Sequence, residues 1–168
     1  MTAADYADRA APPIDVQRVD HVSFTVADIE RSARFYERFG YARVNRYSQS
    51  GSELDRAVAT VPADMEIQIL RRPDGAMLEL IAYTKQPSAR AARNGVVGAG
   101  HIAFVVADIE AAYDELRAAG VEFLSAPNTD QYGERWVYLR DPDGITVELM
   151  QPGEGSERLV AHDHGAAT

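Results

Sequence analysis

The order of apolar and polar positions along the chain predicts one strand-to-helix unit that occurs twice. Residues 21–26 and 101–106 are short runs rich in β-branched and aromatic side chains, which is typical of strands. An aspartate follows each run, Asp28 or Asp108, and can cap the first free amides of a helix. Apolar residues then recur at helical spacing and predict one buried helix face in each copy: Ile29, Ala33, Tyr36 and Phe39 in the first, Ile109, Ala112, Leu116 and Ala119 in the second.

More strands are expected after the predicted helices, which end at Gly40 and Gly120. The Asp-Gly pairs at 74–75 and 143–144 are typical of hairpin turns between the last two strands of each copy. Residues 51–62 have no counterpart in the second copy, and we expect a short helix or a lid there. The expected strands are 42–47, 66–71 and 77–83 in the first copy, and 122–124, 135–140 and 145–151 in the second.

An internal repeat supports this division of the chain. Residues 19–30 return as residues 99–110 with seven of twelve positions identical, and residues 73–80 return as 142–149 with five of eight identical. The repeat predicts an α+β fold of two tandem βαβββ modules, separated by a linker and flanked by tails. The predicted boundaries are 1–17 for the N-terminal tail, 18–83 for the first module, 84–97 for the linker, 98–151 for the second module and 152–168 for the C-terminal tail.

The composition of the chain excludes several classes of function. The chain has 168 residues, of which 46% are hydrophobic, and this is enough for a core. It has no cysteine, which excludes disulfides and thiolate metal sites, so any metal must bind nitrogen and oxygen. The formal net charge of −9, without a basic cluster, argues against a nucleic-acid partner. No apolar run is long enough for a membrane span or secretory signal, so we expect a cytoplasmic protein with a small-molecule substrate.

Four residues of metal-ligand type occupy matching places in the two modules. His21 and His101 start the first strand of each module, and Glu79 and Glu148 lie inside the last strand. A single strand histidine is more often an ordinary polar residue, but here the same pair of residue types recurs in both repeats. A glutamate between large apolar residues is destabilised unless a positive group meets it, and a divalent cation meets this need. Two histidines and two carboxylates suit zinc, nickel, cobalt, manganese or iron.

Four segments carry a resemblance to a known family: residues 21–26, 77–80, 100–104 and 141–149. They resemble the vicinal oxygen chelate superfamily, which includes glyoxalase I, methylmalonyl-CoA epimerase, extradiol dioxygenases, fosfomycin-resistance transferases and bleomycin-binding proteins. The resemblance implies that the paired modules form a curled mixed sheet, with a metal in its cleft that chelates two neighbouring substrate oxygens. The order of the four predicted ligands is similar to that of bacterial glyoxalase I.

Departures from glyoxalase I affect the expected substrate. The glutathione-contacting arginine of that family, four residues after the first histidine, is Thr25 here, and its asparagine, four residues after the first glutamate, is Tyr83. We therefore do not expect a glutathione thioester as substrate. Methylmalonyl-CoA epimerases usually carry glutamine in place of Glu79. Extradiol dioxygenases use two histidines and one carboxylate, and bleomycin-binding proteins lack the ligands.

These observations favour a metal-dependent isomerase, epimerase or lyase that removes a proton next to a metal-bound carbonyl. Glu79 is the first candidate for the catalytic base and Glu148 the second. The residues expected to line the cleft are Thr25, Gln68, Tyr83 and Arg135. The alternatives are an Fe(II)-dependent extradiol-type dioxygenase and a non-catalytic drug-binding resistance protein. Each module has exposed strand edges, so we expect a homodimer, and the metal site lies either within one chain or between two chains.

Overall fold

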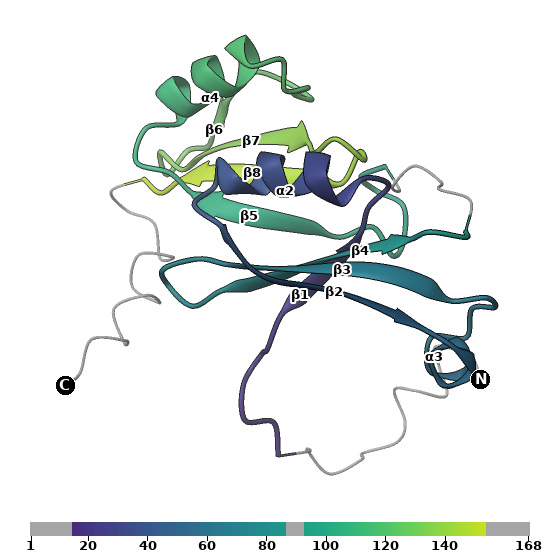
Figure 1. The fold of residues 1–168 in the computed structure, drawn as a ribbon. Coiled ribbons are helices and arrows are strands. Elements are labelled where there is room, and N and C mark those ends of the chain that lie inside the picture. Colours follow the sequence, from purple (N-terminus) through teal and green to yellow (C-terminus); the bar gives the residue numbers. More distant parts are fainter. Residues whose placement is uncertain (1–14, 87–92, 154–168) are drawn as a thin grey trace.

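The computed structural model describes residues 15–86 and 93–153, and these form the two expected modules (Figure 1). The first contains β1 (Val22–Thr25), α2 (Ile29–Glu37), β2 (Ala42–Ser50), α3 (Ser52–Ala57), β3 (Asp64–Arg71) and β4 (Met77–Tyr83). The second contains β5 (His101–Val105), α4 (Ile109–Ala118), β6 (Asn128–Thr129), β7 (Arg135–Arg140) and β8 (Thr146–Gln151). The predicted α+β fold is confirmed. The exact module boundaries stay a prediction, because most of both tails and the middle of the linker lie outside the described residues.

Each module forms a four-stranded mixed sheet of the same topology. The strand orders are β1-β4-β3-β2 and β5-β8-β7-β6, in which the first pair is parallel and the others are antiparallel. Both expected hairpin turns are present, and their glycines, Gly75 and Gly144, have positive φ angles of 89° and 88°. One expected strand is corrected: in 122–124 only Phe123 makes an isolated bridge, to Leu139, and the edge strand is the two-residue β6.

The helices start as the sequence predicts. Asp28 accepts a hydrogen bond from the backbone N–H of Arg31, and Asp108 accepts from the backbone N–H groups of Glu110 and Ala111. The expected short helix in 51–62 is α3. Within the described parts of the chain, no helix is long and apolar enough to cross a membrane, and the cytoplasmic location stays a prediction.

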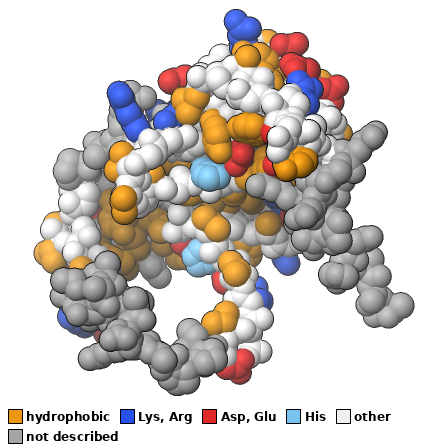
Figure 2. Space-filling view, turned by 180° about the vertical axis from the view of Figure 1, so that it is seen from behind, with side chains coloured by type: hydrophobic (Ala, Val, Ile, Leu, Met, Phe, Trp, Pro, Cys, Tyr) orange, Lys and Arg blue, Asp and Glu red, His pale blue; other side chains and the backbone are white. Residues whose placement is uncertain are grey.

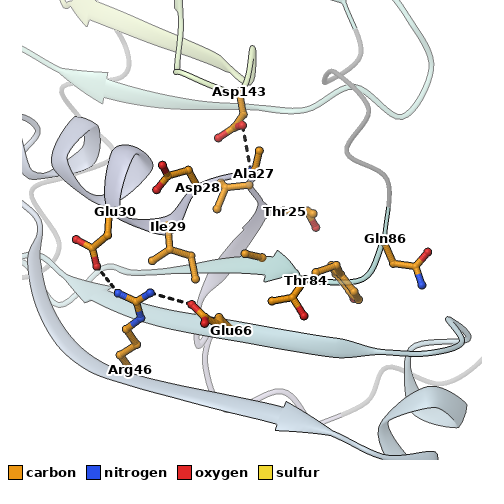
Figure 3. Close-up of a pocket in the computed structure, with 13 residues that line it drawn as sticks. Thr25, Ala27, Asp28, Ile29, Glu30, Arg46, Glu66, Thr84, Gln86 and Asp143 are labelled. Carbon is orange, nitrogen blue, oxygen red and sulfur yellow. Dashed lines mark hydrogen bonds and ion pairs between the residues drawn. The ribbon is translucent and has the colours of Figure 1, made fainter.

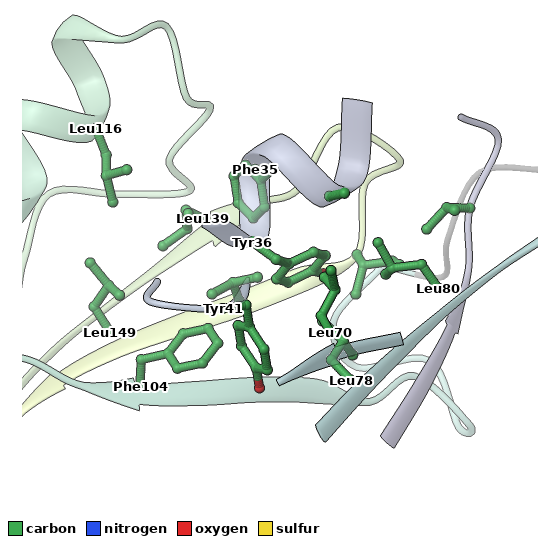
Figure 4. Packing of buried hydrophobic residues seen from close by; sticks show 14 of the residues in the cluster. Phe35, Tyr36, Tyr41, Leu70, Leu78, Leu80, Phe104, Leu116, Leu139 and Leu149 are labelled. Atoms are coloured by element: carbon green, nitrogen blue, oxygen red, sulfur yellow. The ribbon is translucent and has the colours of Figure 1, made fainter. Parts of the chain in front are cut away.

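Helix α2 lies between the two sheets and joins the modules into one core (Figures 1 and 4). Tyr36 of α2 is fully buried, and its neighbours in the core come from both sheets. Phe39, just after α2, stacks on Phe104 of β5 with ring centroids 4.7 Å apart. Asp143, in the β7–β8 turn, accepts a 3.1 Å hydrogen bond from the backbone N–H of Ala27 and a 2.8 Å bond from the Ser32 hydroxyl. The modules are therefore held together through their helix-covered faces, and we call the opposite face of each sheet its open face.

Candidate metal centre

The first histidine and glutamate meet on the open face of the first sheet. Leu78 and Leu80 of β4 are fully buried on the helix-covered face, so Glu79 between them points the other way. Glu79 is opposite Ser23 of β1, and His21 stands two residues before Ser23 on the same face. The distance from His21 Nε2 to Glu79 Oε2 is 3.4 Å, and the Glu79 side chain is only 12% exposed.

The second module repeats this arrangement. His101 starts β5, and Glu148 lies in β8 between the fully buried Val147 and Leu149. His101 Nε2 is 3.1 Å from Glu148 Oε2, and the glutamate side chain is 11% exposed. We call His21 with Glu79 the first half-site, and His101 with Glu148 the second half-site.

The two half-sites do not converge within the chain. Among residues 15–86 and 93–153, no three histidine or acidic side chains lie together as a metal-binding group. Figure 2 shows histidine side chains at two separate places on one face of the molecule. The structure therefore brings the four predicted ligands together as two pairs and not as one cluster.

The spacing within each half-site fits a metal ion. Two donor atoms bound to one ion at about 2.1 Å and at angles of about 90–110° lie about 3.0–3.4 Å apart. The two nitrogen-to-oxygen distances, 3.4 and 3.1 Å, fall at this spacing. A neutral histidine nitrogen and a carboxylate also need a proton or a cation between them when they face each other this closely. Each half-site can thus supply two neighbouring ligands to one ion.

Two tyrosines beside the half-sites were missed by the sequence analysis. The Tyr47 hydroxyl of β2 donates a long, 3.5 Å hydrogen bond to Glu79 Oε1. Desolvation and the charge of Glu79 raise the pKa of Tyr47, so its hydroxyl stays protonated at neutral pH. The Tyr138 ring of β7 stands edge-on to the His101 ring, with centroids 5.7 Å apart. No periodicity could place Tyr47, because a bulge after Arg43 shifts the register of β2.

The four residues expected to line a cleft divide between the two faces of the sheets. Thr25 and Tyr83 lie on the same face as Glu79, and both also line a cavity of about 630 Å³ beside the start of α2 (Figure 3). Gln68 is opposite Leu80, so it lies on the helix-covered face. Arg135 also lies on the helix-covered face of its sheet and pairs with Glu110 of α4.

The expectation for Gln68 and Arg135 is therefore corrected, because both point away from the half-sites. Gln68 is 3% exposed, and its amide donates to the carbonyl oxygens of Asn45 and Ile69 at 2.9 and 3.0 Å. Buried hydrogen bonds of this kind satisfy the amide and explain a polar residue in the core. The ion pair of Arg135 likewise fastens helix α4 to its sheet.

The cavity in Figure 3 is acidic and separate from the predicted ligands. Arg46 bridges Glu30 of α2 and Glu66 of β3, with 2.8 Å from Arg46 Nη2 to Glu66 Oε2. Asp28 and Asp143, which line the cavity, accept hydrogen bonds from backbone N–H groups near the start of α2. None of its lining residues belongs to a half-site.

Residues 18–149 match the Glyoxalase/Bleomycin resistance protein/Dioxygenase superfamily. The chain belongs to this superfamily. Among its relatives is a 2-epi-5-epi-valiolone epimerase from an Actinomyces species, 32% identical over 82% of this chain and 81% of the relative. A lactoylglutathione lyase from Pseudomonas putida is 31% identical over 84% of this chain and 90% of the relative. The crystal structure of a glyoxalase family protein from Bacillus cereus covers 84% of this chain and 98% of its own, with a TM-score of 0.75 and 25% identity.

Members of the glyoxalase superfamily act on small molecules and use divalent metal ions. The superfamily includes enzymes named as epimerases, lactoylglutathione lyases and metallothiol transferases. The resemblance found in the sequence is thus confirmed at the level of the superfamily. The two half-sites described above are consistent with a metal-dependent, glyoxalase-like enzyme.

Proposed function

We propose that the protein is a metal-dependent isomerase, epimerase or lyase that removes a proton next to a carbonyl of a small molecule. Its divalent ion would be zinc, nickel, cobalt, manganese or iron. The observation that carries the proposal is the repeated half-site, in which a histidine nitrogen and a carboxylate oxygen have the spacing of two ligands on one ion. The four ligands would be His21, Glu79, His101 and Glu148.

The metal site is proposed to be shared between two chains. Among the described residues of one chain the four ligands form two pairs and no larger group, and a second copy would supply the missing pair. A twofold homodimer places the first half-site of each copy against the second half-site of the other, and this creates two equal sites. Strands β1 and β5 are the outer strands of their sheets and each carries an exposed valine, Val22 at 46% and Val105 at 64%, which favours contact with a second copy.

The chain's own residues account for the proton transfer. When bound, the ion polarises a substrate carbonyl and acidifies the neighbouring C–H bond. Glu79 accepts that proton, while the electron pair of the C–H bond remains on the substrate. Return of the proton to the opposite side of the same carbon is an epimerisation, and return to a neighbouring atom is an isomerisation. Glu148 is the second candidate for the same role.

The position of Tyr47 supports Glu79 as the first candidate for the base. A carboxylate that stops binding the metal needs another hydrogen-bond donor in order to remain well oriented. The Tyr47 hydroxyl, 3.5 Å from Glu79 Oε1, can supply this donor. The apolar Ile69 of β3, directly opposite Glu79, adds no competing charge.

The substrate is proposed not to be a glutathione adduct, although a lactoylglutathione lyase is among the relatives. Thr25 and Tyr83 lie on the same face of the first sheet as Glu79, but they lack the charged and amide groups expected for glutathione. The similarity to a 2-epi-5-epi-valiolone epimerase supports an epimerase reaction on a small molecule.

Native mass spectrometry together with metal analysis tests this proposal. We expect a dimer that carries two divalent ions and loses them on chelation. A metal-free protein that still binds small molecules would support the drug-binding alternative and contradict the enzyme. A metal-loaded protein that consumes oxygen with a catechol, without proton exchange in any carbonyl compound, would support the dioxygenase alternative.

A further inference from the structure

An arginine shares the open face of the first sheet with the first half-site. Arg71 of β3 is opposite Met77 of β4. Val22 is opposite Leu78 on the helix-covered face. The residue before Val22, His21, is therefore opposite Met77, and both lie on the open face. His21, Met77 and Arg71 thus form one row across the sheet. With neighbouring strands about 4.8 Å apart, the Cα atoms at the two ends of this row are about 10 Å apart.

The second module has the same row, but its arginine, Arg140, is held by hydrogen bonds within the module. His101 is opposite Thr146, which is opposite Arg140. Arg140 Nη1 donates to the Gly144 carbonyl oxygen at 3.1 Å and also to the Thr146 hydroxyl. That hydroxyl donates in turn to Asn94 Oδ1 at 2.5 Å. These bonds hold Arg140 against its own sheet.

Arg71 lacks the contacts that occupy its counterpart. Met77 stands where the second module has Thr146, and a thioether cannot replace the hydroxyl as an acceptor of comparable strength. In the part of the chain that the structure describes, no carboxylate forms an ion pair with Arg71, although the chain carries a net charge of −9. By contrast, Arg43 and Arg46, on the helix-covered face of the same sheet, each pair with two glutamates.

We propose that Arg71 binds an anionic oxygen group of the substrate, such as a carboxylate, a few bonds from the two oxygens that bind the metal. This inference rests on the proposed metal site. A guanidinium recognises a carboxylate through two parallel N–H donors and so fixes its direction as well as its charge. The row places this cation two strands, about 10 Å, from His21. It leaves Ile69, next to Arg71 on the open face of β3, as an apolar neighbour. The substrate class is therefore an anionic carbonyl or hydroxy-carbonyl compound.

Two matched chelators test the inference on the metal-loaded protein by isothermal titration calorimetry. Acetohydroxamate offers two neighbouring oxygens and no further charge, and succinic acid monohydroxamate offers the same oxygens with an added carboxylate. We expect the wild type to bind the carboxylated compound about tenfold more tightly, as a charge-assisted contact requires. Arg71→Gln should remove this preference while acetohydroxamate affinity and metal content stay unchanged.

Arg38→Gln is the matched control, because it removes the same charge from the end of α2, away from the open face. It should keep the preference. Equal preference in the wild type, or an equal loss in Arg38→Gln, would overturn the role of Arg71 while leaving the metal site intact. Failure of both chelators to bind would instead contradict the metal site, and the inference with it.

Discussion

The Tyr36 hydroxyl donates a 3.1 Å hydrogen bond to Asp141 Oδ2 across the boundary between the two modules. Both residues are buried, and the bond connects helix α2 of the first module with the β7–β8 turn of the second. The same turn holds the start of α2 through Asp143. These contacts fix how the two modules of one chain pack against each other.

Removing the Tyr36 hydroxyl should destabilise the fold. Tyr36→Phe leaves a buried acceptor on Asp141 without one of its donors, and this typically costs about 1–3 kcal/mol. Chemical denaturation followed by circular dichroism measures the change in the free energy of unfolding. Tyr132→Phe is the control, because Tyr132 is 67% exposed and its substitution should change stability by less than about 0.5 kcal/mol. Equal effects of the two substitutions would show that the bond does not stabilise the module boundary.

Asp141 should also give stability a specific pH dependence. Burial raises the pKa of Asp141 above its ordinary value of 3.8, even though Ile145, Asp143 and Tyr36 donate hydrogen bonds to it. A raised carboxyl pKa means that the folded state binds the proton more tightly than the unfolded state. This contribution to stability is full below pH 3.8 and is lost as the pH rises through the raised pKa.

Comparison with Asp141→Asn isolates this effect, because asparagine does not titrate. We expect the difference in unfolding free energy, wild type minus variant, to fall as the pH rises from about 4 through the raised pKa. Denaturant titrations at a series of pH values measure it. A difference that increases with pH would mean that the hydrogen bonds to Asp141 outweigh its burial.

Replacing Glu79 tests the proposed catalytic base. Glu79→Gln keeps an amide oxygen that can bind the metal but removes the group that accepts the proton. Loss of a general base costs roughly 10²–10⁴-fold in rate, so turnover should fall far more than metal content. Solvent deuterium incorporation next to the substrate carbonyl measures the proton transfer, after a screen of carbonyl compounds identifies a substrate. Glu148→Gln is the internal control. If only this second variant loses exchange, then Glu148 is the base.

The repeat made much of the fold predictable from the sequence. Asp28 and Asp108 as helix caps, the two hairpin turns and the alternation around Glu79 and Glu148 are local features, and all are present in the structure. Periodicity places each histidine and each glutamate on one face of its strand. Their closeness within a module depends on the sheet order, in which the two strands are direct neighbours.

Other features depend on contacts between distant segments. Gln68 alternates with the apolar Ile67 and Ile69, but alternation alone could not reveal which face of the strand the helices cover. Its face is decided by the carbonyl oxygen of Asn45 in the neighbouring strand. Arg135 was assigned to the wrong face because its partner, Glu110, lies on a helix far from it in sequence. The arrangement of the four ligands as two pairs depends on how the two modules pack, which no local pattern encodes.

Mixed dimers of two inactive variants test the central claim most directly. His21→Ala damages the first half-site, and His101→Ala damages the second, so neither homodimer should bind its full complement of metal. Differently tagged copies of the two variants allow the mixed dimer to be purified. If the site is shared between chains, one of its two sites combines an intact His21 from one copy with an intact His101 from the other. We predict about one tightly bound divalent ion per mixed dimer, against about two in the wild type. A mixed dimer with no more metal than the two parent homodimers would contradict the shared site.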